Sequence, residues 1–297
     1  MKGVTLFLLT LIAVIGLVKR GPAGTATDKP KAEEIISKHL DSIGTAEARA
    51  AGRPRVMVGT THVTFRARGK AEGDGSCVLA SQGEMNMVTM KFGGNDYPYE
   101  KIGFDGSKVT ANQLGPGVYS NLGSFVRSYP LLLKNGLLGG SLSSAWFPLD
   151  LANSKAKLEY GGTKKIDSRQ MIEIRYIPRG GSDLKISLFF DAETFQHVRS
   201  VYKHQIAAQM SRGGLGSRAG GVGREGELSA SQTETRYELV EEFSDFKPEG
   251  GLTLPHTYKI RFSQVGAAAQ YSDWVMTLQQ FIFDQKMGPK DFDVSGN

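Results

Sequence analysis

The amino-acid sequence predicts an α+β fold built around a single antiparallel β-sheet, with about ten to eleven strands. Apolar residues follow the 3.6-residue period of a helix near the start of the chain, but along most of the remainder they alternate with a period of two. Turn signals such as Asp105-Gly106 separate consecutive strand-like segments, as in a meander of hairpins. The regular alternation of strands with helices that indicates a parallel sheet is absent from the pattern.

The first 26 residues have the layout of a secretory signal peptide. Lys2 precedes an apolar run over residues 3–18, and the small residues Gly24-Thr25-Ala26 form a cleavage site. We therefore expect an exported, periplasmic protein, soluble after cleavage, whose mature chain 27–297 is one domain. Because Lys19-Arg20 follows the run, where exported signals usually avoid positive charge, the alternative is an inner-membrane anchor made of residues 3–18.

One amphipathic helix follows the leader. Ala32, Ile36, Leu40 and Ile43 have helical spacing, and Gly44 provides the stop signal. From Val56 the period changes to two, and a phase slip near Thr61 indicates a β-bulge. Further strands are predicted at 76–82, 84–92, 97–104 and 108–110, with Gly73-Asp74-Gly75 as a turn before the first of them.

An apolar segment at 122–150, which we call the helical insert, interrupts the meander. It is hydrophobic over most of its circumference and is broken by Pro130 and Gly136, so it predicts several short helices. Strand periodicity then returns at 157–160, 171–177, 184–190, 195–206, 235–243, 252–262 and 274–283. Residues 211–227 are rich in Gly and Arg and cannot form a core, which predicts a flexible loop.

Composition and charge exclude several classes of function. The chain is 40% hydrophobic and 22% charged, enough for a sizeable core. Its net charge is +6; without Lys2, Lys19 and Arg20 of the leader, 33 basic residues face 30 acidic ones, giving +3. This balance does not indicate a nucleic-acid partner. Cys77 is the one cysteine, so no internal disulfide forms, and its apolar surroundings predict a buried strand position.

Motifs for catalysis are also missing from the sequence. Gly221 to Gly226 match the dinucleotide fingerprint, but the match lies in the glycine-rich loop and lacks a surrounding βαβ unit. His197 and His204 are seven residues apart on one predicted strand, which places them on opposite faces, and His39 is expected on a solvated helix face. We therefore predict a non-catalytic protein without a metal or cofactor. A hydrolase with an unrecognised site is the least favoured alternative.

The remaining signal is apolar. Both faces of the strand at 84–92 carry hydrophobic side chains, and the helical insert could pack directly on the sheet as an ordinary core. The alternative is a cavity between sheet and insert that accepts a lipid or acyl chain. In that hypothesis the cavity is lined by Met85, Met87, Met90 and Phe92, and the lid consists of Phe125, Leu131, Leu132, Leu133, Trp146 and Phe147. A structural or sensory module of the cell envelope, without bound lipid, is the competing hypothesis.

The order of these elements resembles the LolA/LolB-like lipoprotein-carrier superfamily over about residues 30 to 295. The motifs behind the resemblance are Phe104-Asp105-Gly106, the stretch from Leu188 to Thr194, Phe243-Ser244-Asp245-Phe246, and the stretch from Gly250 to Pro255. The resemblance implies an incomplete, strongly curved antiparallel β-barrel with a helical lid. It implies acyl chains of lipids or lipoproteins as ligands, an envelope membrane protein as a further partner, and a monomer.

In the carrier, a basic residue on an early strand helps to hold the lid closed, and the resemblance gives that part to Arg66 or Arg68. This chain departs from the carriers by its longer insert and by the loop at 211–227. A relative that binds another hydrophobic ligand is therefore the alternative to a true lipoprotein shuttle.

Overall fold

A twelve-stranded antiparallel sheet forms the centre of the computed structural model, which describes residues 30–51, 54–67, 69–207, 234–266 and 268–296. The strand order is β5-β4-β3-β2-β1-β12-β11-β10-β9-β8-β7-β6. The strands are β1 (Arg55–Arg66), β2 (Lys70–Gln82), β3 (Met85–Phe92), β4 (Tyr99–Phe104), β5 (Val109–Ala111), β6 (Lys157–Ile166), β7 (Arg169–Ile177), β8 (Lys185–Asp191), β9 (His197–Ile206), β10 (Thr235–Glu249), β11 (Leu252–Val265) and β12 (Ala269–Phe283). The leader, the loop at 211–227 and Arg68 lie outside the described residues.

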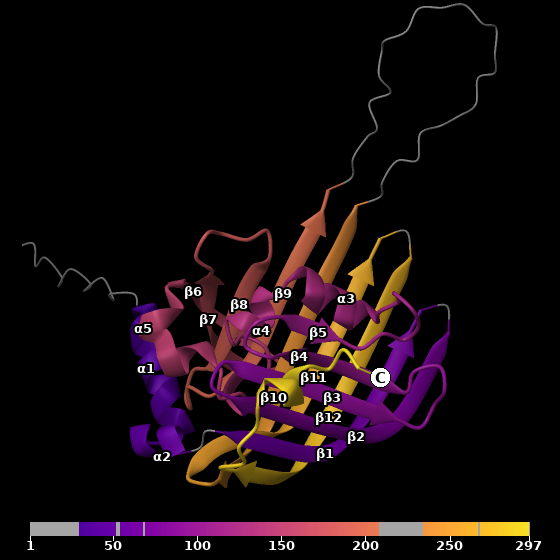
Figure 1. Ribbon diagram of the computed structural model, residues 1–297. Coiled ribbons are helices and arrows are strands. Elements are labelled where there is room, and N and C mark those ends of the chain that lie inside the picture. The colour runs from indigo at the N-terminus through magenta and orange to yellow at the C-terminus, as the bar shows by residue number, and fades with distance from the viewer. Residues whose placement is uncertain (1–29, 52–53, 68, 208–233, 267, 297) are drawn as a thin grey trace, which may run out of the picture.

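The sheet is strongly curved and open. Every pair of adjacent strands is a hairpin neighbour except β1 with β12, which joins the two halves of the meander. Figure 1 shows β1 to β5 crossing in front of the other half, with α3 and α4 between the two. The prediction of a curved antiparallel sheet with few helices is therefore confirmed, and the strand count is slightly higher than expected.

The helices lie at the edges and inside the curve. They are α1 (Ala32–Ile43), α2 (Ala46–Ala51), α3 (Asn121–Ser128), α4 (Leu131–Lys134), α5 (Leu151–Ser154) and α6 (Pro289–Phe292), with short 3₁₀ turns at Gly140–Leu142 and Phe147–Asp150. The first helix ends as predicted, where the Gly44 N–H donates to the Leu40 carbonyl. Within the described ranges, no helix has the length and hydropathy needed to cross a membrane.

Strand alternation divides the side chains between an inner, concave face and an outer, convex face. In β12, Trp274, Met276 and Leu278 point inward and are buried, whereas Tyr271 and Asp273 point outward. The core lies between the inner face and the helical insert, which in the structure runs from α3 to α5. This packing is the usual solution for a sheet with one apolar face.

Two local expectations are wrong. Gly73, Asp74 and Gly75 do not form a turn but lie inside β2, paired with β1. The hydrogen-bond ladders of the neighbouring strands outweigh the local turn preference of these residues. The irregularity in β1 lies between Val58 and Gly59, in its pairing with β12, rather than near Thr61.

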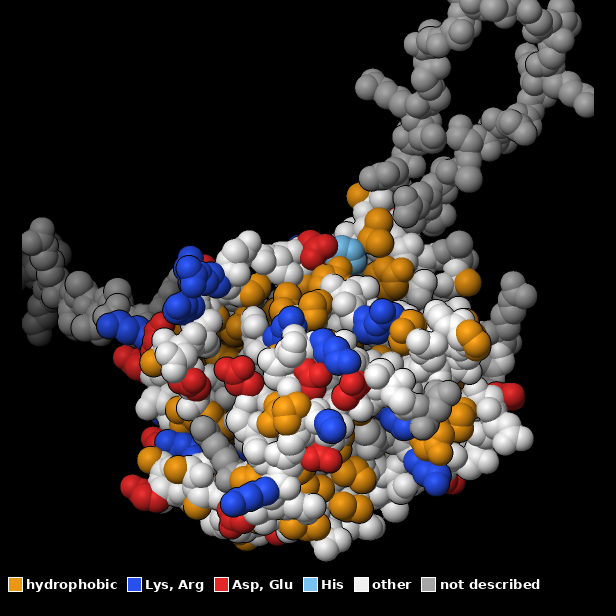
Figure 2. Space-filling model, in the orientation of Figure 1, with side chains coloured by type: hydrophobic (Ala, Val, Ile, Leu, Met, Phe, Trp, Pro, Cys, Tyr) orange, Lys and Arg blue, Asp and Glu red, His pale blue; other side chains and the backbone are white. Residues whose placement is uncertain are grey.

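The outer face has a cover of its own at the front of the sheet, where Figure 2 shows hydrophobic and charged side chains interspersed over the surface. Residues 287–295, which we call the C-terminal cover, cross β3 and β4 and bury Phe292 and Val294. Gly103 makes room for this segment, because a Cβ there would lie 2.4 Å from the Phe292 carbonyl oxygen. Two hydrogen bonds join Gln82 to the backbone of Met287.

Candidate functional site

The helical insert fills the hollow of the sheet. Leu132, Leu137, Leu142 and Trp146 are completely buried against the inner face. Where Leu138 and Leu142 meet Met57 and Leu79, the remaining void is about 10 Å³, which is about the space of one water molecule. At this position the insert and the sheet are therefore in direct contact.

Buried polar side chains hold the middle of the insert on strands β9, β10 and β11. The Glu241 carboxylate accepts hydrogen bonds from the Gly139 N–H at 2.7 Å, the Tyr202 hydroxyl at 2.7 Å and the Tyr258 hydroxyl at 2.5 Å. Burial raises the pKa of Glu241. A buried carboxyl needs such donors, because desolvation is costly when it is not repaid by hydrogen bonds.

Strands β1, β2 and β3 hold the same segment from the opposite side. The Arg55 guanidinium donates to the Ser141 carbonyl at 3.0 Å, and Arg55 is only 1% exposed. The Asn86 amide donates to the Leu133 carbonyl, and the Ser81 hydroxyl accepts from the Ser144 N–H. The insert is thus held mainly through its backbone, by side chains that the two halves of the sheet supply.

A third anchor joins the insert to α1. The Trp146 indole donates to His39 Nε2 at 2.9 Å, and the His39 Nδ1 lies 3.0 Å from the Phe195 carbonyl. The expectation that His39 faces solvent is wrong, since its ring is 1% exposed. Burial lowers the pKa of His39 to about 4, so the ring is neutral at pH 7.

His197 and His204 also differ from the expectation. A register shift at Phe189/Phe190 in the pairing of β8 with β9 breaks the alternation, and both rings face inward. His197 packs beside Gly140, whose positive φ of 49° and lack of a Cβ allow the close approach. Even so, the described part of the chain contains no group of three His, Cys, Asp or Glu side chains placed to hold a metal ion.

The start of α3 rests on a second buried carboxyl group. Ser120 caps the helix by accepting from the Gly123 N–H at 2.8 Å, and its hydroxyl donates to Glu100 at 2.8 Å. Tyr97 donates to the other oxygen of Glu100 and accepts from the Trp274 indole. Burial raises the pKa of Glu100 to about 7. An ionisable group therefore lies directly below the first turn of the insert.

An aromatic groove of about 250 Å³ opens between α3 and the ends of β9, β10 and β11. Phe125 and Tyr129 line it from the insert, and Tyr237 and Phe262 line it from the sheet. The ring centroids of Phe125 and Phe262 are 5.3 Å apart. His204 closes one side, and its Nδ1 lies 3.3 Å from a carboxylate oxygen of Asp183. The groove thus lies at the surface, between the first helix of the insert and the sheet.

The structure divides the predicted cavity residues between the two faces. Met90 and Phe92 are buried on the inner face, where Thr61 bonds to the sulfur of Met90. Met85 and Met87 have the opposite parity in β3, and Met87 lies beside the C-terminal cover. In the lid, Phe125, Leu132, Leu133, Trp146 and Phe147 are buried, and Leu131 is half-buried.

Arg66 does not contact the insert. Its guanidinium bonds to Asp273 at 2.8 Å on the outer face, because its position in β1 has the parity of that face. Arg55 is the basic residue of β1 that reaches the insert, and sequence reasoning missed it. The alternation of side chains along a strand could have identified it, because Arg55 lies two residues before the inward-facing Met57 and therefore faces the same side.

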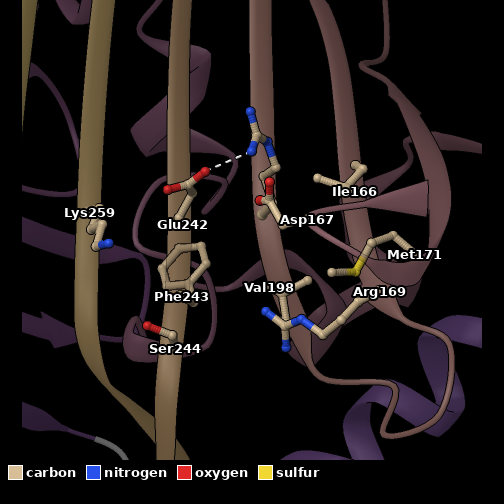
Figure 3. Close-up of a pocket in the computed structure, with 10 residues that line it drawn as sticks. Ile166, Asp167, Arg169, Met171, Val198, Glu242, Phe243, Ser244 and Lys259 are labelled. Carbon is tan, nitrogen blue, oxygen red and sulfur yellow. Dashed lines mark hydrogen bonds and ion pairs between the residues drawn. The ribbon is translucent and has the colours of Figure 1, made fainter. Parts of the chain in front are cut away.

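The outer face also carries a pocket, of about 190 Å³, between the β6–β7 hairpin and strands β9, β10 and β11 (Figure 3). Its centre is polar: Arg199 and Glu242 form an ion pair at 2.7 Å, with Lys259 alongside. Because charged groups dominate its lining, this pocket suits an apolar ligand less well than the aromatic groove does.

The geometry of the inner cluster does not match nucleophilic catalysis. The Ser200 hydroxyl lies 3.0 Å from His197 Nε2, but the carboxylate next to this pair, Glu241, interacts with Ser200 rather than with the far nitrogen of the imidazole. A triad requires the acid on that far nitrogen. Cys77 is buried as predicted, and desolvation raises its pKa to about 12, so its thiol is protonated at neutral pH.

No protein-family model matches the chain, and no curated protein matches its sequence. Among solved structures it is similar to the LolA superfamily protein NE2245 from Nitrosomonas europaea, with 11% identity and a TM-score of 0.45 over 89% of this chain and 97% of that one. It is also similar to a DUF1329 family protein from Desulfovibrio piger, with 9% identity and a TM-score of 0.38 over 89% and 98% of the two chains.

A third similar structure is the lipoprotein LppX from Mycobacterium tuberculosis, with 16% identity and a TM-score of 0.24 over 59% of this chain and 88% of that one. In these three comparisons the sequence identity is at most 16% and the TM-score is at most 0.45. Because these scores are low, the function has to be argued from the geometry of the chain itself.

Proposed function

We propose that the protein is an exported, non-catalytic binding protein for a lipid or for the acyl chains of a lipidated protein. The ligand enters at the aromatic groove and takes the place of part of the helical insert on the inner face. The structure then represents the closed, ligand-free state. This proposal covers a carrier as well as a sensor that stays at the inner membrane.

The observation that carries the proposal is the small volume of the spaces between the insert and the sheet. At about 250 Å³ the aromatic groove is smaller than the roughly 300 Å³ at which ligand pockets begin, and the void where Leu138 and Leu142 meet Met57 and Leu79 is about 10 Å³. A long chain therefore fits only if the insert moves. The anchors in the middle of the insert are mainly side chain to backbone hydrogen bonds, which can exchange with water when the insert leaves.

The energetics allow such an exchange. Burying an acyl chain of about sixteen carbons stabilises the complex by roughly 10 kcal/mol, at about 0.8 kcal/mol per methylene. This gain is offset by the contacts that the insert loses and by the freedom that the ligand loses. Since the inner face remains covered by apolar groups in both states, the sheet itself does not have to unfold.

Native mass spectrometry of the protein purified from a Gram-negative host, combined with lipid extraction, tests the proposal. We expect a co-purifying lipid, and saturable binding of a lipophilic dye after the lipid is removed. The variant Phe125→Asp places a charge in the groove and should abolish dye binding. The matched control is Phe189→Asp in the outer apolar cluster, which should leave dye binding intact in the folded fraction.

If the protein is free of lipid and shows no saturable dye binding, the proposal is wrong. The competing function, an interaction module whose insert is only a core, would then be favoured. Sequencing the N-terminus of the same preparation distinguishes cleavage near residue 26 from retention of the anchor.

A further inference from the structure

The exposed apolar side chains of the protein gather at one end of the sheet. Among the described residues, five large hydrophobic side chains are exposed: Leu114, Val118, Ile177, Val265 and Tyr271. In a meander, alternate turns lie at the same end, and the pairing registers place all five side chains at the end where β7 joins β8, β11 joins β12, and β5 leaves the sheet. We call this end the open rim; Figure 1 shows it along the upper and right-hand side of the molecule.

Separate segments of the chain contribute to the open rim. Leu114 and Val118 flank the small turn Gly115-Pro116-Gly117, with Val118 57% exposed. Val265 lies at the tip of the β11–β12 hairpin. A 2.7 Å hydrogen bond between Asn121 and Gln270 joins these two parts, so their apolar tips form one edge of the molecule.

The aromatic groove opens at this same rim. Asn121 and Gln264 belong to its lining, and both are close in sequence to the exposed tips. The opposite end of the sheet differs, since none of its turns in the described ranges carries an exposed large hydrophobic side chain. Exposed apolar groups that surround the mouth of an apolar groove indicate an interaction surface.

Charge at the rim favours a lipid surface as the partner. The Arg127 guanidinium lies over the Tyr119 ring at 3.8 Å, at the outer side of α3, where it can meet a phosphate group. Asp273 bonds to Arg66 and Arg261, and Glu234 bonds to Arg236, so these two carboxylates repel an anionic headgroup only weakly. The Asp183 side chain on the β7–β8 turn is 66% exposed and lies 3.3 Å from His204 Nδ1, which makes it a rim carboxylate that opposes such a headgroup.

We propose that the open rim docks on the surface of a phospholipid bilayer, with Leu114, Val118, Val265 and Tyr271 inserted among the headgroups. These side chains stand on separate tips around the mouth of the groove, a form suited to the soft interfacial layer of a membrane, and the Arg127 guanidinium lies beside them where it can meet headgroup phosphates. Tyr271 has the apolar ring and polar tip that suit this layer. In this orientation the groove faces the lipid.

Site-specific labelling tests this docking. Cys77 is 1% exposed and its thiol is protonated, so a cysteine added at the surface can be labelled alone. We would place an environment-sensitive fluorophore at Val118→Cys, at Val265→Cys and, as a control, at Ala50→Cys on the exposed surface of α2 at the opposite end. Vesicles of phosphatidylethanolamine and phosphatidylglycerol are then added to each protein.

The expected result is a blue shift and an increase in emission at positions 118 and 265, without change at position 50. In an unlabelled protein, Val118→Asp combined with Val265→Asp should lower the vesicle-bound fraction about tenfold. All these proteins share one N-terminus, so an equal response at all three labels would mean docking through another part and would overturn the proposal. No response at 118 and 265 would overturn it as well and would favour a protein partner. Because the labels report docking whether or not the groove is occupied, this test is independent of the proposed ligand.

Discussion

Glu241 and Glu242 are neighbours in β10, yet their surroundings are opposite. Glu241 faces inward, is completely buried and binds the backbone of the helical insert. Glu242 faces outward and forms a partly exposed ion pair with Arg199. The same contrast holds for the two covers of the sheet. The insert is fastened by the buried carboxyl groups of Glu100 and Glu241 as well as by other polar groups, whereas the C-terminal cover is held by Phe292 and Val294 and by neutral hydrogen bonds with Gln82 and Thr110.

This difference indicates which of the two covering segments can separate from the sheet. Both covers are held partly through backbone N–H and carbonyl groups, which can exchange their partners for water, but the insert also rests on the buried carboxyl groups of Glu100 and Glu241. Buried carboxyl groups below such a segment also make its attachment depend on pH. We therefore propose that the helical insert moves during function, whereas the C-terminal cover has a purely structural role.

Removing the large side chain of each cover should give the largest effects. Trp146→Ala and Phe292→Ala should each lower the free energy of unfolding by about 3–5 kcal/mol, because both side chains are completely buried. Only Trp146→Ala should increase binding of a hydrophobic dye to the folded protein, since only it frees the inner face. Denaturant titration and dye fluorescence measure the two quantities. Equal dye binding by both variants would remove the distinction between the covers.

The two adjacent glutamates provide a sharper comparison. Glu241→Ala leaves the Gly139 N–H and the Tyr258 hydroxyl without their acceptor and should cost about 2 kcal/mol or more. Glu242→Ala removes a partly exposed ion pair and should cost less than about 1 kcal/mol. Hydrogen exchange should show faster exchange around Gly139 in the first variant alone. Similar costs for both variants would mean that Glu241 does not fasten the insert.

The pH dependence of stability tests the anchor below α3. Burial raises the folded-state pKa of Glu100 from 4.5 to about 7. Its contribution to the free energy of unfolding is therefore fully present below pH 4.5, where the carboxyl group is protonated in both the folded and the unfolded chain. Its contribution of about 3 kcal/mol is lost as the pH rises to about 7. His39, whose pKa is lowered to about 4, acts in the opposite direction, so the difference between wild type and Glu100→Gln is the quantity to measure. Parallel stability curves for the two proteins between pH 4.5 and 7 would contradict the assignment.

A substitution below the outer cover should have a smaller and purely structural effect. Met87→Asp places a carboxylate beside Val294 and should cost about 2 kcal/mol. We expect faster proteolysis at the C-terminus together with unchanged dye binding. Loss of dye binding in the folded variant would place Met87 in the ligand site after all.

Much of the fold could be predicted from the sequence because each strand alternates locally and each turn has its own signal. The helix at 32–43 and the apolar insert followed from period and from breakers such as Pro130. The location of individual side chains was harder to predict. The register shift at Phe189/Phe190 turned His197 to the inner face, and such shifts are set by tertiary pairing rather than by local sequence.

The surroundings of the helical insert were predictable in part. Burial of its apolar residues follows from composition, whereas the polar groups that hold it do not, because single residues such as Arg55, Glu100 and Glu241 carry no local pattern. Parity alone could have separated Arg55 from Arg66 and Met90 from Met87. Which face of the sheet is covered by the insert depends on contacts between segments far apart in sequence.

Tying the insert to the sheet tests most directly whether the insert gives way to a ligand. The Asn121 and Gln270 side chains touch at 2.7 Å, so Asn121→Cys with Gln270→Cys can be joined by a short reducible cross-link. The matched control joins the outer cover through Gln82→Cys and Met287→Cys. We expect the first cross-link to abolish saturable binding of a fatty-acid dye, reduction to restore it, and the control cross-link to have no effect. Full binding with the insert cross-linked would contradict the account.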